Sequence, residues 1–391
     1  MNPLLKPEIQ DFINLNITAD IQKLSLQKNP FPTTDYKEIL NQIEAKAKAK
    51  LKLPTWYSAH NIVYPNKISI EQTSSETTAD YKSKLIQGES IIDLTGGFGV
   101  DAYYFSKQFQ QVVHCELDPH LSAIVKHNFK TLHTDNIQCF PEDGLEVLRK
   151  RKHKYDWIYI DPSRRNDIKG KVFLLKDCLP DITTHIDQYL EYSDKILVKC
   201  SPIYDISVGL SELKYIKNIH IVSVDNQVKE LLFEIDKTHQ SDSIPIKTAN
   251  ITLTATEHFD FVWGETTLVN YALPQKYLYE PNASVMKSQG FDQVGYFFGI
   301  HKLHQHSHLY TSNELVSFVG RRFAITHIIA YKKAALKEFL QGKKANVATR
   351  NFPESVAQIR ARWKIADGGD VYCFFTTNLN NEKIVVICTK I

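Results

Sequence analysis

Acidic residues follow four short apolar segments of the chain, each at the place where a β-strand would end. The segments are SIID, QVVHC, NIQCF and DWIYI, and the acidic residues at or just after them are Asp93, Glu116, Asp118, Asp143 and Asp161. A carboxylate can accept hydrogen bonds from the hydroxyls of a ribose or from the exocyclic amine of an adenine. Four such positions in register predict a nucleoside site, although each residue could instead be a helix N-cap.

A glycine-rich turn, DLTGGFG, follows the first of these segments. Its Gly96, Gly97 and Gly99 permit a tight turn and a close approach of the backbone to a ligand. We predict that Asp93 and Thr95 belong to the same ligand site. The spacing differs from the GxGxxG of dinucleotide sites, and no GK[ST] follows as it would in a P-loop. The loop therefore argues against a dinucleotide and against ATP as the ligand of this crevice.

The fourth apolar segment is followed directly by DPSRR. Asp161 could orient a target amine, and Pro162 fixes the turn. Arg164 or Arg165 could hold a phosphate or stack on a base through the guanidinium plane. Lys199 ends the fifth apolar segment, KILVK. We therefore predict a substrate-facing set that consists of Asp161, Pro162, Arg164 and Lys199.

The elements that would position these residues are strands that alternate with helices from about Glu89 to Asp236. Such alternation predicts βαβ units and a parallel sheet. In an open parallel sheet the ligand binds beyond the carboxyl ends of the strands, near the point where the strand order reverses. The last two apolar segments, NIHIVSV and ELLFEI, are separated by a few residues and predict a hairpin that could form an antiparallel edge.

Changes of pattern along the 391 residues predict four parts. Residues 1–87 have helical periodicity, and residues 88–240 have the alternating pattern. Residues 241–320 contain a β-rich link and a small α+β unit, and residues 321–391 predict strand, helix, strand, helix, strand, strand. The expected fold class is α/β, with a Rossmann-like sheet, an N-terminal helical region and C-terminal α+β domains.

Charge is unevenly distributed along the chain. From Arg321 to Ile391 there are 13 Lys and Arg against 5 Asp and Glu, a net charge of 13 − 5 = +8. The whole chain carries +3, so the rest carries 3 − 8 = −5. A basic segment on a mildly acidic body favours a polyanionic partner such as nucleic acid, although a solubilising surface would have the same composition.

Composition argues against several other classes. No apolar run approaches the roughly 18 residues of a membrane helix, so no membrane partner is expected. The six cysteines form no CxxC pair, which argues against a zinc ribbon or a disulfide framework. Four histidines between residues 301 and 308 have no acidic or cysteine neighbour, so we interpret them as a solvated or RNA-facing surface and expect no metal. The N-terminal sequence lacks the form of a secretory signal, and we expect a cytoplasmic protein.

Taken together, the motifs at the strand ends resemble those of the class I S-adenosylmethionine-dependent methyltransferases. DLTGGFGVD is similar to their first motif, CELD to the second, PEDG to the third and IDPSRR to the fourth, over roughly residues 88–236. The resemblance implies a Rossmann-like methyltransferase sheet with S-adenosylmethionine as the cofactor. It also implies that Gly97 and Gly99 border the amino acid end of the cofactor. Glu116 would then hold the ribose, and Asp143 the adenine.

The fourth motif departs from the pattern of the methyltransferases that act on amino groups, which often have Asp/Asn-Pro-Pro-aromatic there. Ser163 replaces the second proline and Arg164 replaces the aromatic residue, so the methylated atom stays open. Asp161 could still orient either a target amine or the methionine part of the cofactor. The stretch KCSP resembles the SCNP of the 5-methyluridine RNA methyltransferases, in which the cysteine attacks the base. Lys199 could lower the thiol pKa of Cys200 for that purpose, although a small buried strand residue is the commoner role of a free cysteine.

The C-terminal part carries a second resemblance. RNFPESVAQIRARWKIADGGDVYCFFT resembles the THUMP-like domain attached to some bacterial methyltransferases, and about residues 276–320 resemble the ferredoxin-like module that precedes it. THUMP domains bind RNA, so the resemblance implies an RNA methyltransferase that acts on rRNA or tRNA. Trp363 could stack on a base or belong to the core of this small domain. Two alternatives stay open: a methyltransferase of protein or of a small molecule, and an RNA-binding protein without catalysis.

Overall fold

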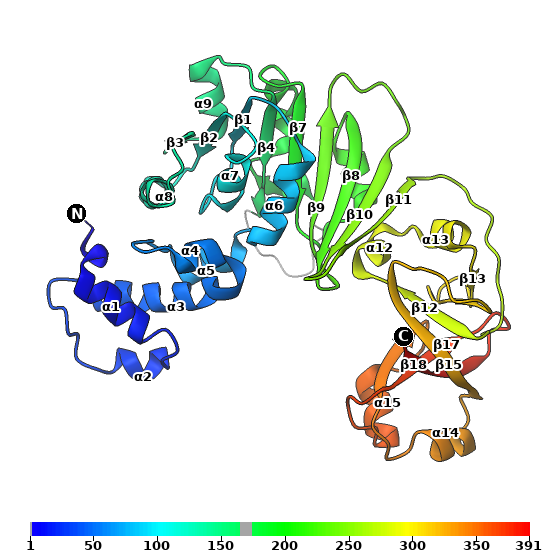
Figure 1. The fold of residues 1–391 in the computed structure, drawn as a ribbon. Helices are drawn as coiled ribbons and strands as arrows, with labels where there is room; N and C mark the ends of the chain where they lie inside the picture. The colour runs from blue at the N-terminus through cyan, green and yellow to red at the C-terminus, as the bar shows by residue number, and fades with distance from the viewer. Residues whose placement is uncertain (1, 165–173) are drawn as a thin grey trace. The chain divides into compact units, whose positions relative to one another are not determined.

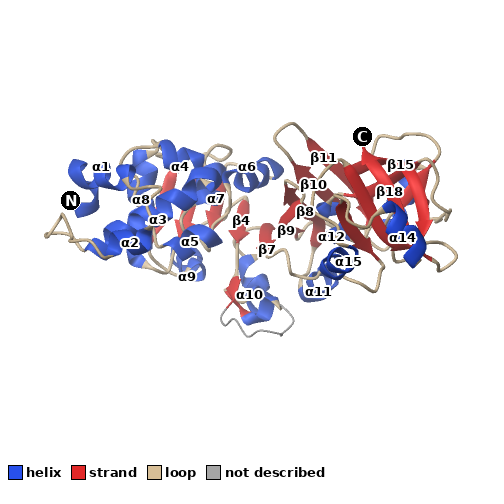
Figure 2. Ribbon diagram, turned by 90° about the horizontal axis from the view of Figure 1, so that it is seen from below, coloured by secondary structure: helices blue, strands red, loops and turns tan. Residues whose placement is uncertain are grey.

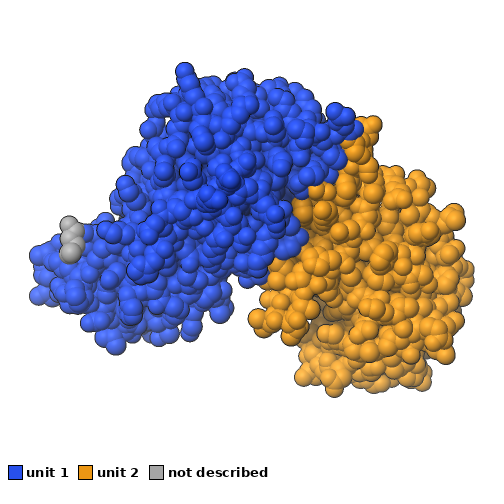
Figure 3. All heavy atoms as spheres, turned by 45° about the horizontal axis from the view of Figure 1, so that its top comes forward, with its two compact units in different colours: residues 1–217, 231–240 blue, residues 218–230, 241–391 orange. Residues whose placement is uncertain are grey.

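The polypeptide forms two units that do not follow the linear order of the chain. The computed structural model describes residues 2–164 and 174–391 (Figure 1). One unit, called unit 1 here, consists of residues 1–217 and 231–240, and unit 2 consists of residues 218–230 and 241–391 (Figure 3). Within the described ranges, no helix has the length and apolar character needed to cross a membrane.

The N-terminal part of unit 1 is helical, as its periodicity predicts. After a 3-10 turn at Pro3–Leu5, its helices are α1 (Pro7–Leu15), α2 (Ile21–Ser25), α3 (Tyr36–Lys52), α4 (Pro54–Ser58), α5 (Lys67–Gln72) and α6 (Glu76–Leu85). Polar side chains cap most of them, and Ser75, for example, accepts a hydrogen bond from the backbone N–H of Thr78 at the start of α6. α5, α6 and the segment between them are the parts of this region that reach the functional site.

Six strands of a nine-stranded sheet, in the order β9-β7-β4-β1-β2-β3, lie wholly or mainly in unit 1. They are β1 (Ser90–Asp93), β2 (Gln111–Cys115), β3 (Ile137–Phe140), β4 (Trp157–Ile160), β7 (Lys195–Cys200) and β9 (Gln227–Asp236). The first five pair in parallel, and β9 is antiparallel to β7. β1 and β4 are buried along their whole length, as expected for central strands of a parallel sheet covered on both faces. The strand order reverses between β1 and β4.

Helices alternate with these strands along the chain (Figure 2). They are α7 (Val100–Phe105), α8 (Pro119–Thr131), α9 (Gly144–Arg151), α10 (Ile182–Tyr189) and α11 (Ile206–Glu212). A short antiparallel pair, β5 (Ser163–Arg164) with β6 (Cys178–Leu179), and a 3-10 turn at Leu175–Asp177 lie between β4 and α10 in the chain. The βαβ pattern predicted from the sequence is thus confirmed.

The predicted hairpin is present, but it lies inside the nine-stranded sheet and not at its edge, and its tip, residues 218–230, belongs to unit 2. β8 (Ile216–Val224) is followed by Asp225 and Asn226, which both have positive φ, and then by β9. Two consecutive residues of this kind are typical of a type I′ turn, whose twist suits a two-residue hairpin. β10 (Pro245–Ile251) pairs in parallel with β8, and β11 (Thr256–Val262) pairs antiparallel with β10.

The rest of unit 2 is built on a seven-stranded sheet with the order β13-β14-β12-β15-β18-β17-β16. Its strands are β12 (Tyr277–Pro281), β13 (His301–Lys302), β14 (Tyr310–Ser312), β15 (Gly320–Ala330), β16 (Asn346–Arg350), β17 (Val371–Thr377) and β18 (Lys383–Lys390). The helices are α12 (Ala283–Ser288), α13 (Phe291–Phe298), α14 (Lys333–Phe339) and α15 (Val356–Trp363). Trp363 is 8% exposed and packs in one apolar core with Leu336 and Ile359, so of its two proposed roles the structure favours the core.

The histidines of the 301–308 stretch do not form the uniformly solvated surface that we expected. His304 is buried, and its two ring nitrogens lie 3.0 Å from the side chains of Asn381 and Asn351. His308 stacks on Phe291 with 3.6 Å between ring centroids. The interpretation is wrong for His304, whose ring links loops within unit 2. In the two described ranges no group of three or more His, Cys, Asp or Glu side chains could hold a metal ion.

Candidate active site

The carboxyl ends of β1, β2 and β4 and the start of α9 surround a cavity of about 390 Å³. This volume lies within the usual size of ligand pockets, roughly 300–1,000 Å³. Glu116, Asp143 and Asp161 all line the cavity, together with residues 94–98 of the glycine loop. The structure therefore brings carboxylates from three of the four predicted strand ends to one space. No Lys, Arg or His side chain lines this cavity in the part of the chain that the structure describes.

The glycine loop lies against a buried histidine of the neighbouring strand. A side chain at Gly96 would place its Cβ 2.2–2.5 Å from three ring atoms of His114, so only glycine fits without movement. The Gly96 N–H donates to the carbonyl of Cys115 at 2.7 Å, which fastens the loop to the end of β2. Gly97 and Gly99 have φ of +53° and +80°, in the left-handed region that favours glycine.

Glu116 connects the end of β2 to the glycine loop. One of its carboxylate oxygens accepts a hydrogen bond from the Gly97 N–H at 2.9 Å, and the other accepts from the Asp118 N–H at 2.8 Å. Each carboxylate oxygen has a second lone pair, and the side chain is partly exposed at the cavity wall. It can therefore shape the loop and also accept hydroxyl groups of a ligand.

Replacement of Glu116 by glutamine is expected to weaken binding of S-adenosylhomocysteine about tenfold to a hundredfold. Glutamine offers one oxygen in place of two, so either a backbone N–H of the loop or the ligand loses a charge-assisted acceptor, worth about 1.5–3 kcal/mol. Isothermal titration calorimetry measures the change, with Glu142→Gln as the matched control in the adjacent motif. An unchanged dissociation constant would contradict the ribose role of Glu116.

Asp118 and Asp143 are both helix N-caps, but only one of them also lies at the cavity. Asp118 accepts hydrogen bonds from the backbone of His120 and Leu121 at the start of α8 and is exposed outside this cavity. Asp143 accepts from the backbone of Leu145 at 2.9 Å at the start of α9 and lines the cavity. The N-cap interpretation therefore describes the protein contacts of both residues, and a ligand role stays a prediction for Asp143.

Asp161 is held from both its backbone and its side chain. Its N–H donates to the hydroxyl of Thr95 at 2.7 Å, and Thr95 is in turn bound through its N–H to Asp93 at 2.9 Å. Its carboxylate forms an ion pair with Lys199, whose side chain is 12% exposed. The side chain of Asp161 is 33% exposed and reaches the cavity, so it can meet a substrate.

The rest of DPSRR is placed only in part. Pro162 is buried, and Ser163 and Arg164 form β5, with Ser163 at the cavity wall. The side chain of Arg164 and the whole of Arg165 lie outside the described residues, so their predicted contacts with substrate stay predictions.

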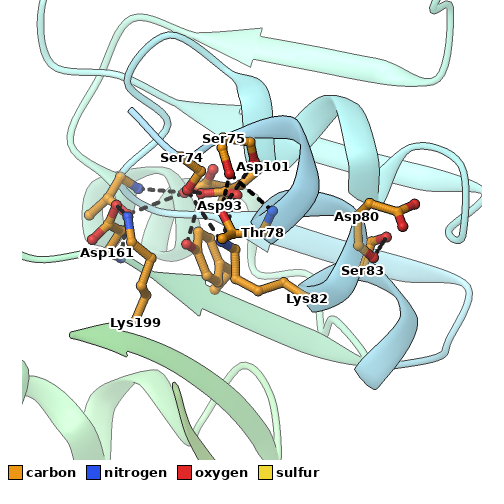
Figure 4. A network of polar contacts seen from close by, with 12 residues as sticks. Ser74, Ser75, Thr78, Asp80, Lys82, Ser83, Asp93, Asp101, Asp161 and Lys199 are labelled. Carbon is orange, nitrogen blue, oxygen red and sulfur yellow. Dashed lines mark hydrogen bonds and ion pairs between the residues drawn. The ribbon is translucent and has the colours of Figure 1, made fainter. Parts of the chain in front are cut away.

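A buried polar network behind the cavity was not predicted from the sequence. The Asp101 carboxylate accepts hydrogen bonds from the Ser74 hydroxyl at 2.8 Å and the Tyr159 hydroxyl at 2.9 Å, and it lies 3.1 Å from the Lys82 ammonium (Figure 4). Asp101 directly follows the glycine loop, which was a usable signal. Nothing in the local sequence marked Ser74 or Lys82, which belong to the N-terminal helical region.

Neighbouring charges and hydrogen bonds give the two buried carboxyl groups Asp93 and Asp101 opposite pKa shifts. Burial raises the pKa of Asp93 well above its usual value, despite hydrogen bonds from Thr95 that lower it, and the charges of Asp101 and Asp161 raise it further. Burial alone would also raise the pKa of Asp101, but Lys82, Lys199 and the hydrogen bond from Ser74 outweigh it and lower that pKa. Asp101, which lines the cavity, is therefore ionised.

Cys200 does not have the features of an activated nucleophile. Its side chain is 2% exposed and does not line the cavity. Burial, the largest effect, raises its thiol pKa well above the usual value, and the opposing charge of Lys199 is too weak to reverse this. The hypothesis that Lys199 activates this thiol is therefore wrong, and Cys200 is a buried strand residue.

Acidification is expected to destabilise unit 1 through His114. Burial lowers the pKa of His114 to about 4, whereas the unfolded chain binds a proton near pH 6.5. Neutral His114 therefore contributes fully to the free energy of unfolding above pH 6.5. The contribution decreases as the pH falls towards 4, and about 2 kcal/mol of it is lost at pH 5. Urea unfolding of the wild type and of His114→Leu at pH 7.5 and 5.0 measures it. If the variant loses as much stability between the two pH values as the wild type, the assignment is wrong.

Comparisons with known proteins agree with this architecture. The solved structure of a Porphyromonas gingivalis W83 protein, provisionally assigned as a methyltransferase, is 30% identical and superimposes with a TM-score of 0.88, covering 98% of this chain and 97% of that one. Two Mycobacterium tuberculosis strains have an uncharacterized S-adenosylmethionine-dependent methyltransferase that is 23% identical over 162 residues. That match spans 41% of this chain and 43% of the length of the curated relatives.

Two domain families match the C-terminal part of unit 2. Residues 277–318 match a ferredoxin-like domain family, and residues 320–390 match a THUMP domain-like family. The fold and site thus define an S-adenosylmethionine-dependent methyltransferase with C-terminal ferredoxin-like and THUMP-like domains. The chain belongs to the family of the Porphyromonas gingivalis protein, with which it shares this arrangement over nearly its whole length.

Proposed function

We propose that this protein transfers a methyl group from S-adenosylmethionine to RNA. The observation that carries the cofactor assignment is the charge of the cavity wall, which has Asp101, Glu116, Asp143 and Asp161 but no basic side chain within the described ranges. A wall of this kind suits a nucleoside with a cationic group, and its described residues offer no basic side chain to a phosphate. S-adenosylmethionine is such a ligand, and it supplies a methyl group already activated on a sulfonium sulfur.

The residues of the chain would then bind and align. Glu116 and Asp143 line the cavity and would accept hydrogen bonds from the ribose and the adenine. The substrate group that receives the methyl can donate a hydrogen bond to Asp161. This contact would hold the lone pair of that substrate group in line with the methyl carbon, and such alignment accounts for much of the rate of methyl transfer. The Lys199 ion pair and the Thr95 hydroxyl limit the movement of Asp161.

The RNA part of the proposal rests on unit 2. Its C-terminal segment has a net charge of +8, and its THUMP-like match points to the same partner. Lys333 and Lys337 on α14 are exposed there, so their charges can face a phosphate backbone. Arg362 on α15 is also exposed and could exchange its ion pair with Glu354, 2.9 Å away, for a phosphate. Such contacts release counterions and make binding depend steeply on salt.

The test uses methyl-labelled S-adenosylmethionine with total RNA, and separately with total protein, from cells that lack the gene. Label in RNA that disappears with Asp161→Ala is the expected result, and the labelled nucleoside can then be identified. Label only in protein would overturn the RNA assignment. Cofactor binding without label in either would point to a small-molecule substrate or to a binding protein.

A second measurement tests the surface that presents the RNA. Lys333→Ala/Lys337→Ala/Arg362→Ala is expected to reduce the slope of log affinity against log salt by about 0.7–0.9 for each lost phosphate contact. Lys23→Ala/Lys28→Ala removes two exposed charges from the N-terminal region and serves as the matched control. An unchanged slope in the triple variant would place the RNA surface elsewhere.

A further inference from the structure

A lysine ammonium is buried next to the cavity, in a region of the chain that carries no methyltransferase motif. Lys82 on α6 is 0% exposed, and its ammonium lies 3.1 Å from Asp101 and 3.2 Å from the Ser74 hydroxyl. Removing a charge from water costs several kcal/mol, and a well-packed apolar residue often stabilises a fold at least as well as a buried ion pair. This charge therefore calls for an explanation other than stability.

The network is oriented with respect to the cavity. Asp101 lines the cavity, whereas Lys82 does not, and the Lys82 ammonium lies 3.1 Å from the Asp101 carboxylate (Figure 4). Ser74 lines the same cavity and donates to the Asp101 oxygen that also accepts from Tyr159. The carboxylate is held by groups from α6, from the segment before it and from β4, which leaves it little freedom to turn away.

We propose that Lys82 and Ser74 are positioning residues that hold Asp101 as an ionised carboxylate on the cavity wall, where it favours the cationic methyl donor over its product. This inference rests on the proposed function. S-adenosylmethionine carries a positive sulfur, and S-adenosylhomocysteine carries a neutral one at the same place. A fixed negative charge at this wall discriminates between them, so it binds the donor and releases the product. The N-terminal helical region then completes the cofactor site.

The test measures the dissociation constants of both ligands by calorimetry and takes their ratio. Asp101→Asn is expected to weaken binding of S-adenosylmethionine about tenfold more than binding of S-adenosylhomocysteine, because the sulfonium is the one charge by which the two ligands differ. Lys82→Met is expected to have the same effect, and Lys82→Arg to restore the ratio. Lys84→Met is the matched control, since Lys84 lies on the same helix but is exposed and pairs with Asp80.

Folding is followed in parallel by thermal unfolding. Lys82→Met alone leaves a buried carboxylate without its main partner and is expected to destabilise unit 1, whereas Lys82→Met/Asp101→Asn removes both charges and recovers most of the stability. The double variant should still show the reduced ratio. The inference would be overturned if Asp101→Asn and the double variant weakened binding of both ligands equally. It would also be overturned if neither variant changed the dissociation constant of either ligand. A wild-type protein that binds neither ligand would overturn the proposed function as well.

Discussion

Replacement of Asp161 by asparagine is expected to lower the rate of methyl transfer at least a hundredfold while leaving cofactor affinity within about threefold. Asparagine keeps the shape of the side chain and the backbone hydrogen bond to Thr95, so the glycine loop is unaffected. It loses the negative charge that pairs with Lys199 and that can accept a hydrogen bond from the acceptor group. Loss of one orienting or proton-accepting group typically costs about 10²–10⁴ in rate.

Single-turnover transfer to RNA, with cofactor affinity measured separately, distinguishes alignment from binding. Lys199→Met is expected to have a smaller effect, because Asp161 keeps its charge but loses its partner. Asp187→Asn removes an exposed carboxylate of α10 and serves as the control. A large loss of cofactor affinity in Asp161→Asn with an unchanged transfer step would assign Asp161 to the cofactor and leave the acceptor to other residues.

Gly96→Ala is expected to destabilise unit 1 by about 1–3 kcal/mol or more and to weaken cofactor binding at least a hundredfold. The added Cβ would lie 2.2–2.5 Å from the ring of His114, which is fully buried and packs edge-on against Phe129. The ring has no space to move into, so overpacking must displace the loop and break its hydrogen bond to Cys115. The displaced loop then closes part of the cavity that it lines.

Two further variants test this cause. Gly97→Ala meets no atom closer than 3.9 Å, so it costs only about 1–2 kcal/mol for the left-handed backbone conformation. Gly96→Ala/His114→Ala makes room for the methyl group and is expected to bind the cofactor better than Gly96→Ala alone. Thermal unfolding and calorimetry provide both measurements. If the second substitution restores no affinity, a steric conflict with His114 is not the cause.

The cavity could be anticipated from the sequence because the relevant information is local. Each of Glu116, Asp143 and Asp161 follows an apolar strand, and the carboxyl ends of parallel strands meet at one edge of a sheet. The glycine spacing similarly indicates a turn that needs positive φ and lets the backbone approach a ligand closely. Gly97, whose φ is positive, lies in this turn. The same local pattern could not separate Asp118 from Asp143, because both are helix N-caps and only the fold shows which one reaches the cavity.

The rejected alternative for Cys200 and the wrong expectation for His304 have a common cause, which is that sequence neighbours need not share an environment. Lys199 and Cys200 are adjacent, but successive strand residues point to opposite faces of the sheet. Lys199 therefore pairs with Asp161 at the cavity, while Cys200 is buried away from it. His304 lies in a polar stretch, yet contacts with Asn351 and Asn381 bury it.

The class of fold, the glycine loop and the acidic strand ends could be predicted from consecutive residues, because hydrophobic periodicity and the residue types at strand ends are local properties. Which groups are removed from water, and what they contact there, depends on the tertiary structure. Lysine is seldom buried, so no pattern in the N-terminal helical region predicted that the Lys82 ammonium would lie 3.1 Å from Asp101. The pKa of a carboxyl group at this site depends on its burial and on the charges beside it. Both are set by segments that are distant in the chain.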